Sequence, residues 1–217
     1  MSGSLKHRKE QLSRAKSALS FSAVKSYALR VRDHTLDFFK KSRENMNNAL
    51  NWVKLSLGER KLHITNLIKH ALRFGGKDYD VKITFAANDS KSPGALGATD
   101  GNEIFIYDSL VASNNHDEVV EVCNHEPTHV RDIKEPGTTA LDADTVKIGL
   151  ENYVLPDENY DIYKNDNPVE IIAFETGRTS GKGLAKELTL LDEFHQKKTQ
   201  NIFMPTFREN AGYSRAA

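Results

Sequence analysis

The sequence Val122-Cys-Asn-His-Glu-Pro-Thr-His-Val-Arg-Asp132 holds two histidines four residues apart, with a glutamate directly after the first. On a helix, residues four apart lie on the same face, so His125 and His129 can bind one metal ion together. Glu126 follows the first of these ligands, and from there its carboxylate can take a proton from a water molecule at the ion. The spacing therefore predicts a helix over residues 117–133 that carries a zinc site.

Pro127 occupies the interior of this predicted helix. Its nitrogen carries no hydrogen, so the bond to the carbonyl of Cys123 is lost, and its ring disfavours helical backbone at Glu126, at a cost of about 3 kcal/mol. Zinc binding contributes on the order of 10 kcal/mol in structural sites, which is enough to hold a mildly distorted turn. Three interpretations stay open: a working metal site, a weakened or inactive one, and a protein without a metal in which the two histidines lie on the surface of an ordinary amphipathic helix.

A catalytic zinc site needs a third protein ligand. A third histidine six residues after His129 is absent, which excludes the extended metzincin pattern. Glu170, in Asn167-Pro-Val-Glu-Ile-Ile-Ala173, is the better candidate, because a carboxylate among apolar residues is costly without a partner. The alternative is that Glu170 only stabilises the N-terminus of its helix. Glu175 is a fallback ligand, and Asp132 is either a partner of the ligands or a surface charge.

At these residues the chain resembles the zincin metallopeptidases, and within them the gluzincin branch. Its members take two zinc ligands from His-Glu-x-x-His and a glutamate from a later helix. The segment 94–107 resembles the edge hairpin that precedes the zinc helix in such proteins. The resemblance covers about residues 80–200. It implies an α+β, zincin-like fold with a small antiparallel or mixed sheet, and a cleft under an edge strand.

The same resemblance implies a zinc-dependent endopeptidase that hydrolyses a protein substrate through a zinc-activated water. Its zinc ligands would be His125, His129 and Glu170, with Glu126 as general base. In this family a tyrosine or histidine outside the motif often stabilises the oxyanion, and the candidates here are Tyr153, Tyr160, Tyr163 and His195, with Arg178 as a further one. The chain also looks like bacterial toxin and effector peptidases, which implies an inhibitor or immunity partner.

The segments on either side of the motif follow from hydrophobic periodicity and from turn residues. Residues 1–20 are polar and predicted to be irregular. Apolar stripes predict helices from Phe21, over 33–57 with an end at Gly58, and over 59–74 with an end at Gly75-Gly76. Alternation predicts a strand at 81–85 and a hairpin at 95–107, after a loop at 88–94. The connection 134–167 is predicted to be partly helical, and further helices begin at Pro168 and span 184–198, before a loose tail beyond Pro205.

The charge distribution divides the chain near residue 75. Residues 1–75 carry 16 Lys and Arg against 5 Asp and Glu, whereas residues 76–217 carry 14 against 25. We therefore expect a basic helical N-terminal extension, residues 1–75, and a zincin-like metallopeptidase domain, residues 76–217. The basic front either packs on or near the acidic back, stays a solvated surface, or serves as an arm for nucleic acid or an anionic membrane. No nucleic-acid motif accompanies these charges, which disfavours nucleic acid as a partner.

Composition restricts the remaining classes. The single cysteine, Cys123, excludes an intramolecular disulfide, and no apolar run reaches the length of a membrane span. The first residues lack the apolar core of a Sec signal peptide, so we expect a cytoplasmic protein of the producing cell or one secreted by another route. Besides the peptidase, two functions stay open: a catalytically inactive zincin fold used for binding, and a binder that acts through the basic front.

Overall fold

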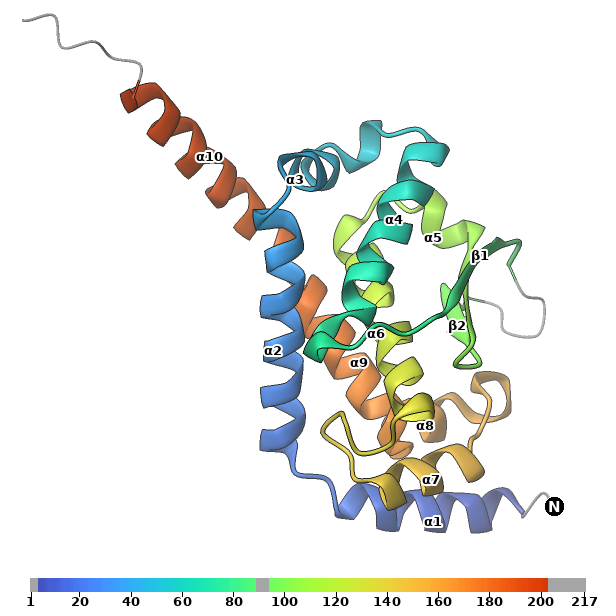
Figure 1. Cartoon of the computed structure of the whole chain (residues 1–217). Helices are drawn as coiled ribbons and strands as arrows, with labels where there is room; N and C mark the ends of the chain where they lie inside the picture. The colour runs from blue at the N-terminus through green and yellow to red at the C-terminus, as the bar shows by residue number, and fades with distance from the viewer. Residues whose placement is uncertain (1–3, 89–93, 203–217) are drawn as a thin grey trace, which may run out of the picture.

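The computed structural model describes residues 4–88 and 94–202 as a mixed α+β fold that is mostly helical, with one small three-stranded sheet (Figure 1). The chain begins with α1 (Leu5–Ser17), α2 (Phe21–Lys40), α3 (Arg43–Leu50), the 3-10 turn η1 (Trp52–Lys54), α4 (Leu57–Leu72) and η2 (Phe74–Gly76). It continues with β1 (Lys82–Ala86), β2 (Gly97–Thr99), β3 (Glu103–Tyr107), α5 (Asp108–Ala112), α6 (His116–Lys134), α7 (Ala143–Glu151), α8 (Pro156–Asp166), α9 (Pro168–Gly181) and α10 (Leu184–Ile202).

The sheet has the order β1-β3-β2, with β1 parallel and β2 antiparallel to the central strand β3. The predicted hairpin between β2 and β3 is confirmed. Gly101 adopts φ +91° in its turn, and the Asp100 carboxylate accepts hydrogen bonds from the backbone N–H groups of Asn102 and Glu103. This topology leaves β2 at one edge of the sheet, next to α6.

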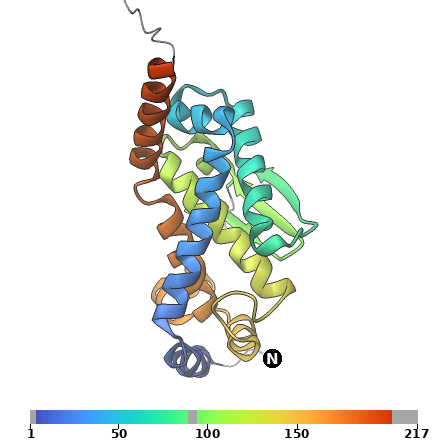
Figure 2. The same ribbon diagram turned by 60° about the vertical axis from the view of Figure 1, so that its left-hand side comes forward.

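The main core joins the sheet to helices from both halves of the sequence. Figure 2 shows α2 lying across the molecule, where it packs against α9 and α4. The largest buried members of this core come from α2, α4, β3 and α10: Phe39, Ile64, Leu67, Ile68, Ile104, Ile106 and Leu188. The core thus includes residues on both sides of position 75, where the sequence predicts a domain boundary; that boundary stays a prediction.

The helices α6 and α9 make the most extensive helix–helix contact in the fold. Two glycines of α9 allow this approach. A Cβ atom at Gly177 would lie 2.6 Å from the backbone oxygen of Glu121, and a Cβ atom at Gly181 would collide with the backbone oxygen of Asp117. Because only hydrogen fits at these two positions, the two helices cross with their backbones in close contact.

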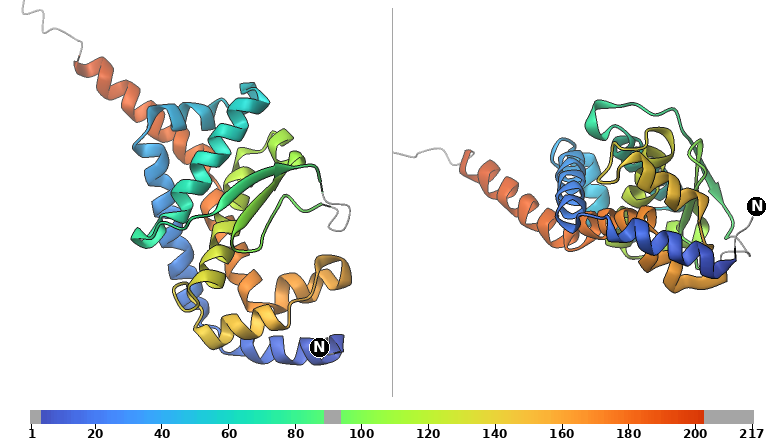
Figure 3. Two further views of the ribbon diagram at one scale, coloured as in Figure 1. Left: turned by 45° about the vertical axis from the view of Figure 1, so that its right-hand side comes forward. Right: turned by 90° about the horizontal axis from the view of Figure 1, so that it is seen from below.

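The prediction that residues 1–20 are irregular is wrong, because α1 covers most of them. Ser4 caps this helix by accepting a hydrogen bond from the N–H of His7. Leu12 is fully buried against Val154 and Ile162, and Arg8 donates to the carbonyl of Tyr153. Figure 3 shows α1 beside α7 and α8 at one end of the molecule. Polar composition hid a helix that tertiary packing stabilises.

The predicted helix over residues 33–57 is also wrong. It divides at Ser42, whose hydroxyl accepts from the N–H of Asn45 and so starts α3. Gly58 lies in the first turn of α4 rather than at a helix end, because Ser56 and Glu59 form a capping box there. Several residues of the expected apolar faces are exposed instead: Val53, Leu57 and Leu62.

The other predicted elements are confirmed in type and approximate position, including the helix end at Gly75 and Gly76 and the helix start at Pro168. The loop predicted at 88–94 and the tail predicted beyond Pro205 lie largely outside the described residues. Within the described residues, no helix has the length and apolar character that crossing a membrane requires.

Candidate metal centre

The His-Glu-x-x-His segment lies in the middle of α6. Asn115 caps this helix, and the backbone stays helical through Pro127 to Lys134. The Nε2 atoms of His125 and His129 are 3.0 Å apart, and both side chains are 12% exposed. The proline therefore does not separate the two imidazoles, which face the same point in space.

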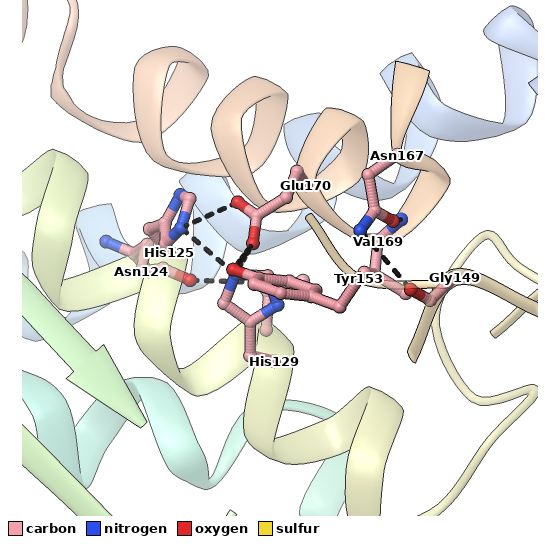
Figure 4. Close-up of polar contacts among 9 residues, drawn as sticks. Asn124, His125, His129, Gly149, Tyr153, Asn167, Val169 and Glu170 are labelled. Carbon is pink, nitrogen blue, oxygen red and sulfur yellow. Dashed lines mark hydrogen bonds and ion pairs between the residues drawn. The ribbon is translucent and has the colours of Figure 1, made fainter. Parts of the chain in front are cut away.

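Glu170 reaches this point from the first turn of α9. Asn167 starts that helix by accepting a hydrogen bond from the N–H of Val169, and its amide donates to the carbonyl of Gly149. The carboxylate of Glu170 is fully buried, 3.5 Å from Nε2 of His125 and 3.4 Å from Nε2 of His129. Figure 4 shows the three side chains pointing toward one another from two crossing helices.

These distances allow the three side chains to share one divalent cation. The two Nε2 atoms are 3.0 Å apart, and each has a different oxygen of Glu170 near it, Oε2 at 3.5 Å from His125 and Oε1 at 3.4 Å from His129. One ligand atom from each of the three residues lies within 4.8 Å of the other two. Two imidazoles and one carboxylate leave a fourth coordination position open, which is the donor set of a catalytic rather than a structural site.

The buried carboxyl groups of the site have to be balanced. Glu126, Asp132 and Glu170 are all buried, with exposed fractions of 5%, 0% and 0%. The buried cation nearest in sequence, Arg131, donates to two backbone carbonyls and a tyrosine hydroxyl, and to none of these carboxylates. Because isolated buried carboxylates are costly, the site needs either protons or a metal ion to balance them.

Protonation follows from this environment. Burial raises the pKa of Glu126 to about 7 and that of Asp132 to about 6. Burial and the neighbouring His129 lower the pKa of His125 to about 4, so this imidazole is neutral and has a lone pair for a metal. The Glu170 carboxylate outweighs burial and raises the pKa of His129, since without a metal the pair forms a buried ion pair.

Tyr153 holds the Glu170 carboxylate. Its hydroxyl donates to Oε1 of Glu170 over 2.5 Å. Burial and the negative charge of Glu170 raise the pKa of Tyr153, so the hydroxyl keeps its proton. The sequence suggested Tyr153 as a residue that stabilises the oxyanion, whereas in the structure its hydroxyl donates to the Glu170 carboxylate. Nothing in the sequence points to this contact, because it joins α9 to a loop residue seventeen positions earlier.

Asp132 is not a surface charge, and that interpretation is wrong. It is fully buried, and its Oδ1 atom accepts a hydrogen bond of 2.7 Å from the hydroxyl of Thr139. The segment after α6 folds back over the last turns of the helix and covers the carboxylate. The negative charge of Asp132 contributes to the raised pKa of His129, so Asp132 acts on a ligand histidine electrostatically.

A cavity of about 490 Å³ opens beside His125. Part of its lining is the segment from Gly94 to Gly97, which leads into the edge strand β2, and the rest comes from α6, α8 and α9. His125 and Glu126 both line it. A Cβ atom at Gly97 would lie 3.1 Å from Oε1 of Glu126, so the carboxylate lies directly against the edge strand. Of the three clustered residues, His125 lines this space, which is large enough for a ligand.

The remaining predicted residues separate into two groups. Tyr160, Tyr163 and Arg178 line the cavity. Glu175 lies away from the histidines and pairs with Arg178 at 2.6 Å, so it is not the third donor of the cluster. His195 lies on the exposed half of α10, outside the cavity lining.

No protein-family model, curated protein or solved structure matches this chain. The residues and their geometry therefore carry the functional interpretation alone.

Proposed function

We propose that this chain is a zinc-dependent endopeptidase of the zincin type. The observation that supports it is the meeting of His125, His129 and Glu170 beside a cavity into which Glu126 also projects. His125, His129 and Glu170 would hold the zinc ion, and Glu126 would act as general base. The donor set favours zinc, which prefers imidazole nitrogen and carboxylate oxygen in a four-coordinate site.

The chemistry divides between the ion and the protein. A bound zinc ion supplies a Lewis acid that makes water a nucleophile at neutral pH. Glu126, whose side chain lines the same cavity as His125, would accept the proton of that water and pass it to the leaving amine. Tyr153 keeps the Glu170 carboxylate in place, and Tyr163, whose pKa burial raises, stays protonated and offers a donor in the cavity.

An extended peptide is the substrate that suits the cavity. The edge strand β2 has β3 on one side, and its first residue, Gly97, lines the cavity together with the three residues before it. A substrate backbone can pair with this edge and pass over α6, where the histidines lie. A protein substrate, and an inhibitor or immunity protein that covers the same cavity, are the partners that the proposal implies.

A different use of the basic front has less support. Four ion pairs join N-terminal cations to acidic residues of the C-terminal half: Arg8–Glu158, Lys16–Asp166, Arg32–Glu187 and Arg43–Asp192. These cations are therefore engaged within the chain, which favours packing on the acidic back over a free arm for nucleic acid or membranes.

The inactive-relative alternative rests on Pro127. If the proline weakened the site, Pro127→Leu would raise zinc affinity sharply. We expect the zinc affinity to change by no more than a few-fold, because the Nε2 atoms of the two imidazoles already lie 3.0 Å apart, close enough to bind one ion. Isothermal titration with zinc measures the difference directly.

The first test of the proposal is metal content and peptidase activity in three proteins. Purified wild-type protein should contain one zinc per chain by mass spectrometry and cleave an unfolded protein such as casein. Glu126→Gln should keep the zinc and lose activity by about 10²–10⁴-fold, since it removes only the base. His125→Ala should lose both. Full activity in Glu126→Gln would overturn the mechanism, and absence of zinc in the wild type would overturn the metal site.

A further inference from the structure

The face of α6 that carries the ligand histidines continues toward the start of the helix as an acidic face. Glu121 precedes His125 by four residues and Glu118 precedes it by seven, so both lie on the same side of the helix. Both side chains line the same cavity as His125. At 1.5 Å per residue, they lie about 6 Å and about 10 Å from His125 along the helix axis.

Glu121 has no counter-charge at hydrogen-bonding distance. Within the described residues, no hydrogen bond or ion pair reaches its carboxylate. Burial, together with the charges of Asp117 and Glu118, raises the pKa of Glu121 and outweighs the attraction of Arg178, which lies farther away than a hydrogen bond. Glu118 accepts a hydrogen bond from Ser113, which is neutral. Two negative groups therefore share one wall of the cavity and repel each other.

The cavity lining provides little positive charge to balance them. Among the described residues of the lining, Arg178 is the only cation, and it binds Glu175 at 2.6 Å with its side chain 61% exposed. A second feature of the cavity points the same way. Glu126 is 5% exposed, lines the cavity, and has no hydrogen-bond partner in the described part of the chain. The lining thus holds three carboxyl groups against one cation that is already paired, and the two that have no role in the proposed chemistry, Glu118 and Glu121, favour a positively charged ligand.

We propose that Glu121, with Glu118, forms a subsite for a lysine or arginine side chain of the peptide substrate. The inference rests on the proposed peptidase function and names the substrate class of that site. An extended peptide advances about 3.3 Å per residue, so the basic residue lies two or three positions from the bond that is cut. Its apolar stem packs on Val122 and Phe174, which line the same cavity, while its charge meets the carboxylates.

The test uses the full-length zinc-loaded protein and a set of peptides that share one sequence. For each position within three residues of the cleaved bond, the set includes one peptide with lysine, one with norleucine and one with glutamate at that position. Norleucine keeps the apolar stem and removes the charge. We expect one position at which kcat/KM for the lysine peptide exceeds that for norleucine about ten-fold, the value of a charge-assisted hydrogen bond in a partly buried site. The glutamate peptide should be the poorest substrate.

Glu121→Gln should reduce this lysine preference to less than two-fold. Glu193→Gln, the same change at an exposed position of α10, is the matched control and should keep the full preference. Arg178→Gln should keep or increase it. A preference that is absent in the wild type and emerges only in Arg178→Gln would overturn the proposal, since Arg178 would then be the internal partner of Glu121.

Binding separates the inference from the proposed function. Fluorescent lysine and norleucine peptides are titrated into zinc-loaded Glu126→Gln. Tighter binding of the lysine peptide, lost on adding Glu121→Gln, supports the subsite even if the wild type cleaves neither peptide, a result that would reject the peptidase instead. Cleavage of both peptides at equal rates keeps the peptidase and overturns the subsite.

Discussion

Two pairs of histidines in this molecule have nearly the same geometry and opposite surroundings. His125 and His129 have Nε2 atoms 3.0 Å apart, and His63 and His116 have Nε2 atoms 3.1 Å apart. The first pair meets the Glu170 carboxylate at the wall of a cavity. The second pair, between α4 and the start of α6, is buried among aromatic rings.

The difference lies in the partners of each pair. Around His63 and His116 lie Phe38, Phe39 and Trp52, and the nearby cation Arg60 stacks on the tryptophan ring. No carboxylate joins this pair to make a metal cluster within the described residues. Proximity of two imidazoles is therefore not enough for a metal site. The pair on α6 is distinguished by the buried carboxylate of Glu170 beside it and by the cavity that His125 lines.

Removing the third donor should make the first pair resemble the second. One of three ligands contributes roughly 4 kcal/mol of zinc affinity, so Glu170→Ala should weaken binding about a thousand-fold and abolish peptidase activity. His63→Phe is the matched change in the other pair and should keep one zinc per chain. Zinc titration with a competing chelator measures both. Equal loss of zinc from the two variants would mean that the pairs are not functionally different.

Acid should act on the second pair. Burial lowers the pKa of His63 to about 4, and burial with the neighbouring His63 lowers that of His116 to about 3. An unfolded histidine binds a proton near pH 6.5, so the unfolded state gains protons first and stability falls as the pH drops from about 6.5 toward 4. The loss from His63 alone is on the order of 3 kcal/mol.

Urea unfolding of the metal-free protein between pH 7 and 4.5 tests this expectation. The double variant His63→Phe, His116→Phe should show a smaller decrease in unfolding free energy over that range than the wild type. If the unfolding free energy of the double variant falls with pH as steeply as that of the wild type, groups other than His63 and His116 cause the acid sensitivity.

The smallest effect concerns the support of the third donor. Tyr153→Phe removes the hydrogen bond to Glu170 and keeps the ring, so zinc affinity should fall by about 10–100-fold, the usual effect of losing such a contact. Tyr160→Phe, on an exposed tyrosine of the cavity rim, is the control and should leave zinc affinity unchanged. Equal affinity of Tyr153→Phe and the wild type would show that packing alone positions the carboxylate.

Much of this fold could be predicted from the sequence because helix ends, turns and helix faces depend on residues that are close together in the chain. Gly75 and Gly76 end a helix with positive φ angles, and Gly101 turns the hairpin between β2 and β3. The spacing of His125 and His129 predicted one helical face, and that arrangement survives Pro127. In each case the decisive interaction lies within about five residues.

Interactions between distant segments could not be predicted in this way. The helix α1 depends on Leu12 packing against Val154 and Ile162. The burial of Asp132 depends on a segment that folds back over α6, where Thr139 donates to it. The role of Tyr153 depends on a contact across two elements. A single sequence carries no record of such pairings, so composition suggested disorder or exposure instead.

The two glycines of α9 have a further consequence. Gly177 and Gly181 set the distance between α9 and α6 by the thickness of the backbones themselves. The two histidines belong to α6 and Glu170 belongs to α9, so the distance between the helices determines how far the Glu170 carboxylate lies from the two imidazoles. If the cluster binds a metal, its selectivity for ionic radius would thus be set away from the ligands, by the absence of two methyl groups.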